Sequence, residues 1–365
     1  MEWIELGKLA EIQTGKLNAN AAIENGKYPF FTCADEISYI DKYEYDKECI
    51  LVAGNGNLNV KYYNGKFNAY QRTYIIESKD TNKLDTMYLF YFMNTYMDKL
   101  RDLSIGGVIK YIKLGHLTGA KIPVPPIKIQ KQIVEVLDEA QKLIDNRKKQ
   151  IKLLDDLIES IFYDMFGDPV KNDKGWEVKK LGELGELERG KSKHRPRNDP
   201  SLYGGKYPFI QTGDIANSGL YLVDYETTYS EKGLKQSKMW GKNTLCITIA
   251  ANIAKTSILN IEACFPDSVV GFISNKHSNV IYIRTWFLFF QDIIEKSAPK
   301  SAQRNINLKI LNNLDVIAPP LPLQNQFAER VQAIEKQKEL LEESLKLMED
   351  NYNSLMQRAF KGELF

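Results

Sequence analysis

The sequence repeats itself, because motifs of its first half return in the same order in its second half. The stretch Gly26-Lys27-Tyr28-Pro29-Phe30 returns as Gly205-Lys206-Tyr207-Pro208-Phe209. Farther along, the offset settles at 194 residues, so that Pro125-Pro126 becomes Pro319-Pro320. Such a period is far longer than the roughly 20 to 50 residues of a solenoid or propeller repeat. The sequence therefore predicts a duplicated module of domain size.

The second part of each module carries a helical pattern. Apolar side chains recur in alternating steps of four and three residues, with Arg147 filling one gap in the first copy and Lys338 one in the second. This period of 3.5 residues is typical of a coiled-coil seam. The seam residues are Ile133, Leu137, Ile144, Ile151, Leu154 and Ile158 in the first copy, and Phe327, Val331, Leu341, Leu345, Met348 and Leu355 in the second.

Two seams of equal length most simply bury each other as an antiparallel helix pair, since each alone would expose a long apolar stripe. The alternative is that each helix packs on its own globular domain or on another protein. The span from Ile133 to Met165 corresponds to a helix of roughly 48 Å at about 1.5 Å per residue.

The stretches before each helix read as mixed, β-rich globular domains. Short apolar runs between Gly, Asn and Asp clusters, at 49–53, 74–76 and 245–249, predict strands, and helices are expected around 87–100 and 284–294. The predicted fold class is α+β, with two similar β-rich domains joined by two long antiparallel coiled-coil helices in a pseudo-twofold arrangement. The predicted boundaries are 1–126 for the first domain, 127–166 for the first helix, 167–320 for the second domain and 321–365 for the second helix.

Length and composition agree with this organisation. The 365 residues exceed what one hydrophobic core usually holds. The longest apolar run, Trp286 to Phe290, is too short for the roughly 20 residues of a membrane span, and the N-terminus has no secretory pattern, so we expect a cytoplasmic protein. Four widely spaced cysteines and three scattered histidines suggest buried thiols and no metal site.

Charge points to nucleic acid only locally, because the net charge of the chain is +2. Several loops of both halves combine Lys and Arg, which reach phosphates, with Asn and Gln, which pair with base edges. For any single loop the alternative is a solvated turn, but recurrence in both halves favours binding. The candidate DNA-binding residues are Lys16, Asn57, Lys61, Tyr62, Arg72, Lys110, Tyr111, Lys191, Lys193, Arg195, Arg197, Gln211, Thr212, Lys235, Lys238, Lys255, Ser301, Gln303, Arg304 and Asn305.

One segment imitates a nucleotide site. Residues 185–192 satisfy the phosphate-loop pattern G-x-x-x-x-G-K-S. That loop must open a helix, whereas Pro196 and Pro200 follow here, and the first half has Ala10 and Leu17 at the ends of the matching stretch. We therefore predict no ATP site, and the sequence shows no other catalytic motif.

Taken together, these residues resemble the specificity subunits of Type I restriction-modification systems. The resemblance covers essentially the whole chain. Its carriers are the proline-rich start of each helix with Gln130, Gln132, Gln324 and Gln326, the junction Met165-Phe166-Gly167-Asp168-Pro169, the segment Gly175 to Glu183, and the segment Tyr207 to Ile215. The resemblance makes the domains target recognition domains and the long helices spacer helices.

The resemblance implies a sequence-specific DNA-binding subunit without a catalytic centre of its own. It implies that two modification methyltransferase subunits dock on this chain, that restriction or translocase subunits join in some systems, and that S-adenosylmethionine is bound by the methyltransferase and not by this chain. The domains share little sequence outside the framework, so we expect an asymmetric, bipartite DNA target. From the helix length we expect half-sites about 10 to 14 base pairs apart. The alternative from another class is a paired-helix scaffold whose end domains bind proteins.

Overall fold

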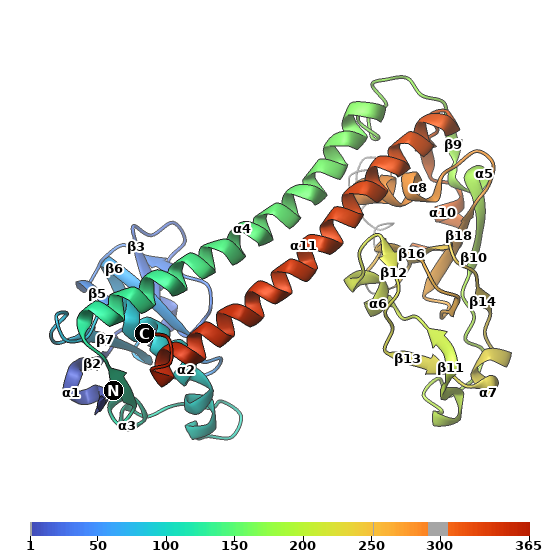
Figure 1. The fold of residues 1–365 in the computed structure, drawn as a ribbon. Helices are drawn as coiled ribbons and strands as arrows, with labels where there is room; N and C mark the ends of the chain where they lie inside the picture. Colours follow the sequence, from blue (N-terminus) through green and yellow to red (C-terminus); the bar gives the residue numbers. More distant parts are fainter. Residues whose placement is uncertain (1, 251, 291–305) are drawn as a thin grey trace. The chain divides into compact units, whose positions relative to one another are not determined.

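The computed structural model describes residues 2–250, 252–290 and 306–365, and the chain divides into two compact units. One unit holds Met1–Lys148 together with Glu343–Phe365, and the other holds Lys149–Glu342. The two long helices, α4 (Ile127–Phe166) and α11 (Leu321–Lys361), each contribute to both units (Figure 1). Each unit therefore consists of a globular domain and parts of both helices.

The domain of the first unit is built on a six-stranded sheet in the order β2-β7-β5-β6-β3-β4. Within it β3 pairs with β6 in parallel and the other neighbours are antiparallel. A separate two-stranded sheet joins the first strand, β1, to β8, which leads into α4. The elements before α4 are β1 (Glu2–Glu5), α1 (Leu6–Leu9), β2 (Ala10–Thr14), η1 (Ala19–Ala21), β3 (Tyr28–Phe31), β4 (Ser38–Ile40), β5 (Tyr45–Ala53), β6 (Val60–Ala69), β7 (Thr73–Ser78), α2 (Thr86–Leu103), α3 (Leu114–Thr118) and β8 (Lys121–Val124).

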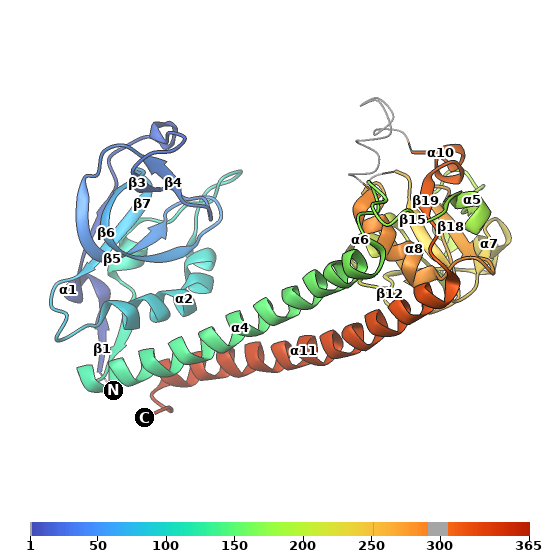
Figure 2. The ribbon, with the colours of Figure 1, turned by 90° about the horizontal axis from the view of Figure 1, so that it is seen from above.

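Helix α2 connects the sheet of this unit to the long helices. Figure 2 shows α2 between the strands and the α4 and α11 pair. Its buried side chains share one core with Ile50 and Ile76 of the sheet, Leu137 of α4 and Phe360 of α11. The second face of the sheet carries its own apolar cluster around Leu51. The C-terminal turns of α11 are therefore part of the core of the first domain.

The domain of the second unit uses two larger sheets, in the orders β10-β18-β15-β16-β12 and β13-β11-β17-β14, and a two-stranded sheet of β9 and β19. As in the first unit, the two-stranded sheet precedes the long helix. The elements are β9 (Val178–Lys180), α5 (Leu181–Leu184), β10 (Gly185–Arg189), η2 (Pro200–Leu202), β11 (Tyr203–Phe209), α6 (Thr212–Asn217), β12 (Tyr221–Leu222), β13 (Thr227–Tyr229), α7 (Glu231–Lys235), β14 (Met239–Trp240), β15 (Leu245–Thr248), β16 (Thr256–Leu259), β17 (Ala263–Cys264), β18 (Val269–Ser274), α8 (Val280–Trp286), η3 (Phe287–Phe289), α10 (Leu308–Asn312) and β19 (Asp315–Ile317).

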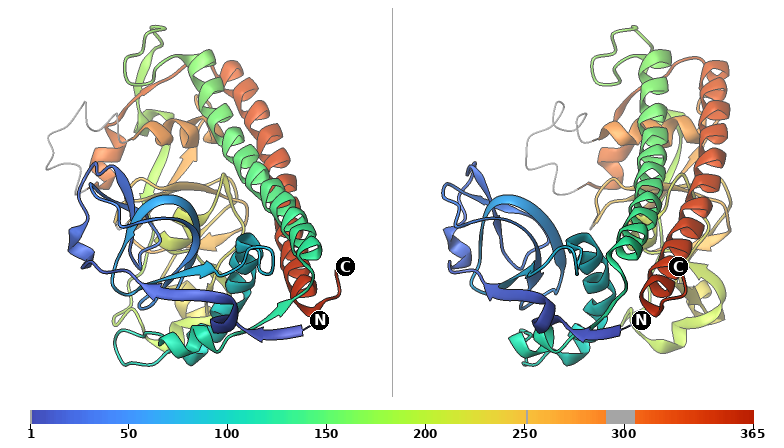
Figure 3. Two further views of the ribbon diagram at one scale, coloured as in Figure 1. Left: turned by 90° about the vertical axis from the view of Figure 1, so that its left-hand side faces the viewer. Right: turned by 60° about the vertical axis from the view of Figure 1, so that its left-hand side comes forward.

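The long helices pack antiparallel within each unit. In the first unit Ile133 shares a core with Phe360, and Lys148 pairs with Glu349. Later residues of α4 therefore contact earlier residues of α11. In the second unit Asp155 pairs with Lys338 and the following turns bring Phe162 against Phe327. Both views of Figure 3 show the two helices side by side. The helices have 40 and 41 residues, which confirms the prediction of a matched antiparallel pair.

The seams are buried in two ways, so both sequence interpretations hold in part. Near the helix ends Ile133, Leu137 and Phe327 are buried against the domains, whereas the mid-helix seam residues Ile151, Leu341 and Leu345 are only partly buried. In the second unit Phe162 and Phe166 of α4 are fully buried as well. The 4-3 pattern missed Phe162 because that side chain faces the domain and not the partner helix alone.

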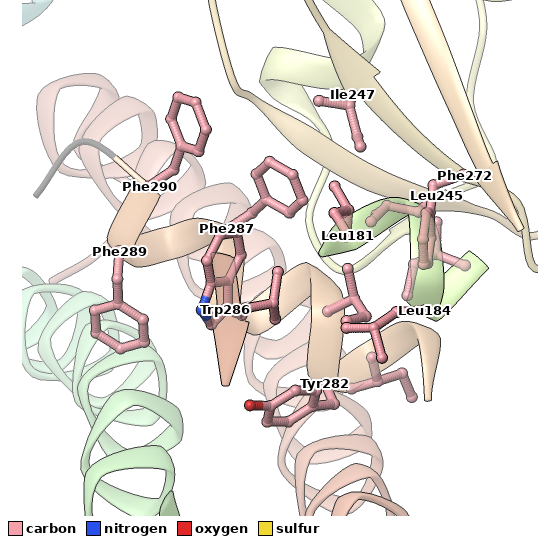
Figure 4. Close-up of a cluster of buried hydrophobic side chains, with 14 of the residues drawn as sticks. Leu181, Leu184, Leu245, Ile247, Phe272, Tyr282, Trp286, Phe287, Phe289 and Phe290 are labelled. Carbon is pink, nitrogen blue, oxygen red and sulfur yellow. The ribbon is translucent and has the colours of Figure 1, made fainter. Parts of the chain in front are cut away.

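Helix α8 joins the second domain to the helix pair. Figure 4 shows Tyr282 and Trp286 on α8 and Phe289 on the following η3, with Phe289 directed toward α4. The ring of Phe162 lies 5.6 Å from Tyr282 and 5.0 Å from Phe289, centroid to centroid. Helix α8 therefore has the role that α2 has in the first unit.

The predicted strands lie in β5, β7 and β15, and the helix expected at 87–100 is α2. The helix expected at 284–294 was placed too late. It begins at Val280, because the side chain of Asn279 accepts a hydrogen bond from the backbone N–H of Ile281 (2.9 Å) and caps the first turn. The expected residues beyond 290 lie outside the described part of the chain.

Candidate nucleic-acid interface

In the first domain, three loops meet to form a polar surface. The loop after β5, the turn between β6 and β7, and the loop after α2 are held together through their backbones. The N–H of Gly54 donates to the carbonyl of Arg72 (2.8 Å), the N–H of Gly56 to that of Lys110 (3.0 Å), and the N–H of Ile112 to that of Gly54 (2.9 Å). This three-loop surface therefore brings Asn57, Arg72, Lys110 and Tyr111 together, as a binding site spread over distant sequence segments requires.

The candidate residues on and near this surface differ in how free they are. The side chains of Arg72 and Lys110 are exposed and form no ion pair within the described part of the protein. Asn57 donates to Asp35 (3.2 Å), and Lys61 donates to the carbonyl of Ala34 (2.8 Å), while burial lowers the pKa of Lys61. Arg72 and Lys110 are therefore the side chains of this surface best suited to contact phosphates.

Two candidates of the first domain are engaged elsewhere. Lys16 pairs with Glu44 at 2.5 Å. The hydroxyl of Tyr62 donates to Glu48 (2.9 Å) and its ring packs on Phe90 of α2, while burial and the Glu48 carboxylate raise its pKa to about 12. Tyr62 therefore lies on the α2 side of the sheet and not in the three-loop surface.

The three-loop surface is also hollowed. Thr14, Gly54, Gln71, Arg72, Tyr74 and Ile112 line a recess of about 320 Å³. An arginine and an exposed glutamine beside a recess supply hydrogen-bond donors and an acceptor, the groups that recognise the edge of a base.

In the second domain, the basic segment 191–197 packs against residues 235–238. The N–H of Lys193 donates to the carbonyl of Gln236 (3.4 Å), and the hydroxyl of Ser237 donates to the carbonyl of Lys191 (2.8 Å). These contacts bring Lys191, Lys193, Arg195, Lys235 and Lys238 into one basic loop pair.

Much of the positive charge of this basic loop pair is neutralised internally. Glu188 accepts from both Lys191 (2.8 Å) and Lys238, and these hydrogen bonds hold the pKa of the Glu188 carboxyl below its usual value. Lys238 also lies over the ring of Trp240, 3.8 Å from its centroid. Arg197 is bound by both carboxylate oxygens of Asp267, at 2.9 and 2.8 Å.

Four candidate cations of the second domain have no carboxylate partner among the described residues. Lys193, Lys235 and Lys255 are exposed, and Arg195 donates only to the carbonyls of Ser192 (2.7 Å) and His194 (2.8 Å). These four side chains can meet a phosphate without breaking an ion pair.

The other candidates lie apart from the basic loop pair or outside the described residues. Gln211 precedes α6 and donates to Thr227 (3.1 Å), while Thr212 opens that helix. Lys255 lies in the turn before β16. Ser301, Gln303, Arg304 and Asn305 are outside the described residues.

The segment that imitates a phosphate loop has a different structure. Gly185–Arg189 is strand β10, paired with β18, and no helix follows it directly. The N–H of Gly190 donates to Val269 (2.9 Å) and that of Lys191 to Phe265 (3.1 Å), so the amides that would hold phosphates are already used. The segment therefore lacks the loop-to-helix geometry that a phosphate loop requires.

Sequence reasoning missed two buried glutamines, Gln130 and Gln324, as functional candidates. Both are fully buried at the start of a long helix and hydrogen-bonded to the domain before it. Their recurrence at the constant offset was the available signal. The expectation that all four thiols are buried was wrong for Cys33, which is only partly covered because it lies on the rim near Arg72.

Among the described residues, no helix is long and apolar enough to cross a membrane. Within the same residues, no group of three or more His, Cys, Asp or Glu side chains is arranged to hold a metal ion.

The fold and these surfaces define a tandem recognition protein, with two β-rich domains that each present cation-bearing loops and each continue into a long helix. The family model described as "Type I restriction modification DNA specificity domain" matches residues 1–155 and 173–349. The chain therefore belongs to this family of Type I DNA specificity subunits, which favours DNA recognition over the scaffold alternative.

Individual relatives agree with the family match. The chain is 27% identical to the Type I restriction enzyme EcoDI specificity subunit of Escherichia coli, over 100% of this chain and 89% of the relative. It is 23% identical to the MjaIX specificity subunit of Methanocaldococcus jannaschii, over 78% and 70% of the two chains. The fold resembles that of the S subunit of a Type I system from M. genitalium, with a TM-score of 0.61 at 18% identity, covering 99% of this chain and 96% of the other.

Proposed function

We propose that this chain reads an asymmetric, bipartite DNA sequence, one half-site per domain, for a Type I restriction-modification complex. The observation that supports this most is the presence, in both family-matched halves, of exposed cations without carboxylate partners beside amide-bearing loops. Cations place the protein on the phosphates, and amide and guanidinium groups read base edges.

The asymmetry of the target is inferred from the difference between the two domains. The first domain carries its candidate loops on a six-stranded sheet, and the second carries them on sheets of five and four strands. The loops at their surfaces also differ. In the first domain Arg72 and Lys110 form no ion pair among the described residues, whereas in the second domain Glu188 pairs with two lysines of the basic loop pair. Two unlike readers predict two unlike half-sites.

The chemistry of the complex is assigned to partner subunits. We propose that two modification methyltransferase subunits dock on this chain and bind S-adenosylmethionine, that restriction or translocase subunits join them, and that this chain itself is not catalytic. The complex would act in the cytoplasm, where its DNA substrate lies in a bacterial or archaeal cell.

The test is to sequence the methylome of a host that carries the complete system. A single asymmetric motif of two half-sites, methylated on both strands and absent when this chain is deleted, is the expected result. Binding of the purified chain to duplex DNA should weaken steeply with salt. A methylome unchanged by the deletion, or salt-independent association with a protein in place of DNA, would contradict the proposal.

A further inference from the structure

A buried glutamine joins each recognition domain to its long helix. In the first unit the Oε1 of Gln130 accepts a hydrogen bond from the backbone N–H of Asp85 (2.9 Å). Its Nε2 donates to the carbonyls of Lys83 and Pro125, both at 2.8 Å. Lys83 and Asp85 precede α2 of the domain, whereas Pro125 begins the turn into α4. The amide therefore ties the two elements together.

The second unit repeats this arrangement residue for residue at the offset of 194. The Oε1 of Gln324 accepts from the N–H of Asn279 (2.9 Å), and its Nε2 donates to the carbonyls of His277 (3.2 Å) and Pro319 (2.8 Å). Both glutamines have no exposed surface. All three partners are backbone groups, so the geometry persists although the partner residues differ between the halves.

A tyrosine reinforces each junction. The hydroxyl of Tyr88 on α2 donates to the carbonyl of Pro123 (2.8 Å), and that of Tyr282 on α8 donates to the carbonyl of Ile317 (2.7 Å). Pro123 and Ile317 lie in β8 and β19, the strands that lead into the long helices. We call each set of a glutamine and a tyrosine with their partners a latch.

The latches stay the same where the domains differ. The sheets of the two domains have different strand numbers and orders, yet both latches use the same side chains on the same backbone positions. An apolar side chain in place of glutamine would fill the space but leave one N–H and two carbonyls without partners in a buried site. The need for glutamine at both junctions indicates that the two latches have the same structural role, which does not depend on the DNA sequence that each domain reads.

We propose that Gln130 and Gln324 are positioning residues that fix the angle between each recognition domain and its helix, and thereby sharpen the selection of spacer length in the DNA target. This inference rests on the proposed function, because spacer selection exists only for a bipartite reader. Without the latch, only apolar packing holds the angle at the Pro125-Pro126 or Pro319-Pro320 junction, and such packing constrains rotation less strictly than directional hydrogen bonds. The preferred spacer would then be less sharply distinguished from its neighbours, while the half-site sequences stay the same.

The first experiment measures the angle directly in the full chain. Spin labels at Lys42→Cys on the first domain and Lys142→Cys on α4, both exposed positions, in a Cys33→Ser background report their distance distribution. Gln130→Met is expected to broaden this distribution. The matched control is Leu51→Ala, which removes buried volume from the far face of the sheet without touching the latch. A distribution as narrow as in the control would overturn the proposal.

The second experiment measures methylation of a spacer-length library by the complete complex. Gln130→Met and Gln324→Met should each reduce the preference for the best spacer over its one-base-pair neighbours several-fold, with both half-sites unchanged. An unaltered spacer profile, equal to that of Leu51→Ala at a similar loss of thermal stability, would overturn the positioning role. If the unmodified complex methylates no bipartite site, the proposed function fails, while the distance measurement still decides whether the latch holds the angle.

Milder variants keep the test decisive if the methionine variants do not fold. Tyr88→Phe and Tyr282→Phe each remove one hydrogen bond and retain the ring. They should broaden spacer selection in the same direction but less than the glutamine variants. No broadening in either tyrosine variant, together with no change in the distance distribution, would count against the latches as positioning devices.

Discussion

Lys338 of α11 and Asp155 of α4 form an ion pair with 2.6 Å between Nζ and Oδ1, at the polar position of the second helix seam. The lysine side chain is 16% exposed and that of the aspartate 52%. The Lys338 charge that interrupts the apolar pattern is therefore neutralised by a carboxylate of the facing helix α4. The apolar seam continues on both sides of Lys338.

Loss of the Asp155 carboxylate should destabilise the protein more than replacement of Lys338 by an apolar side chain. Asp155→Ala takes the hydrogen-bonded carboxylate away from a largely covered ammonium and is expected to lower the unfolding free energy by about 1 kcal/mol. Lys338→Met replaces the ammonium with an apolar side chain and should leave stability unchanged or raise it. Calorimetric melting of both variants checks this order, and a larger loss in Lys338→Met would refute it.

The cations without carboxylate partners should dominate DNA affinity. Lys110→Ala, Lys193→Ala and Lys255→Ala should each weaken duplex binding and reduce the slope of log K against log salt by about 0.9. Arg197→Ala should have a smaller effect, because Asp267 already neutralises this guanidinium. Titrations at several salt concentrations measure the slopes, with Lys142→Ala on α4 as the control. Equal slopes for all five proteins and the parent would remove these residues from the interface.

The length of the helices should set the spacer. Deleting one heptad from each helix, at 148–154 and 341–347, removes about 10 Å of helix, or roughly three base pairs of duplex. These segments face each other in the antiparallel register given by Lys148 with Glu349 and Asp155 with Lys338. We expect a shorter preferred spacer with the same half-sites in a methylation assay on a spacer library. The same spacer in parent and deletion variant would mean that the helices do not determine it.

Thiol reactivity should separate Cys33 from the other cysteines. Burial raises the pKa of the Cys49 thiol to about 12 and also raises the pKa values of Cys246 and Cys264, so all three stay protonated and covered at pH 8. One thiol per chain should react rapidly with an aromatic disulfide reagent in the native protein, and Cys33→Ser should abolish this fast phase. Rapid labelling of more than one thiol under native conditions would disagree with the burial.

The sequence was informative wherever a signal is local or repeated. The constant offset, the proline pairs and the 3.5-residue period predicted two modules and two matched antiparallel helices. The start of α8 was missed because Asn279 was not considered as a cap, although its residue type permits it. The recurrence of Gln130 as Gln324 was visible, but its meaning depends on backbone groups of Lys83 and Asp85 that only the folded chain brings close.

The state of the basic residues was beyond the reach of sequence. Glu188 and Lys238 are 50 residues apart and Arg197 and Asp267 are 70 apart, so their pairing depends on the strand pairings of the second domain. From the sequence, Lys191, Arg197 and Lys238 were expected to be available for phosphate contacts. The structure shows that each has a carboxylate partner, which shifts the expected contribution to Lys193, Lys235 and Lys255.

The placement of Met356, Ala359 and Phe360 in the core of the first domain has a consequence for biosynthesis. A ribosome has already produced the whole second domain before it supplies these side chains. During translation the first domain therefore has an incomplete interior until these residues emerge, and a stop codon just before Met356 would damage the first domain and spare the second.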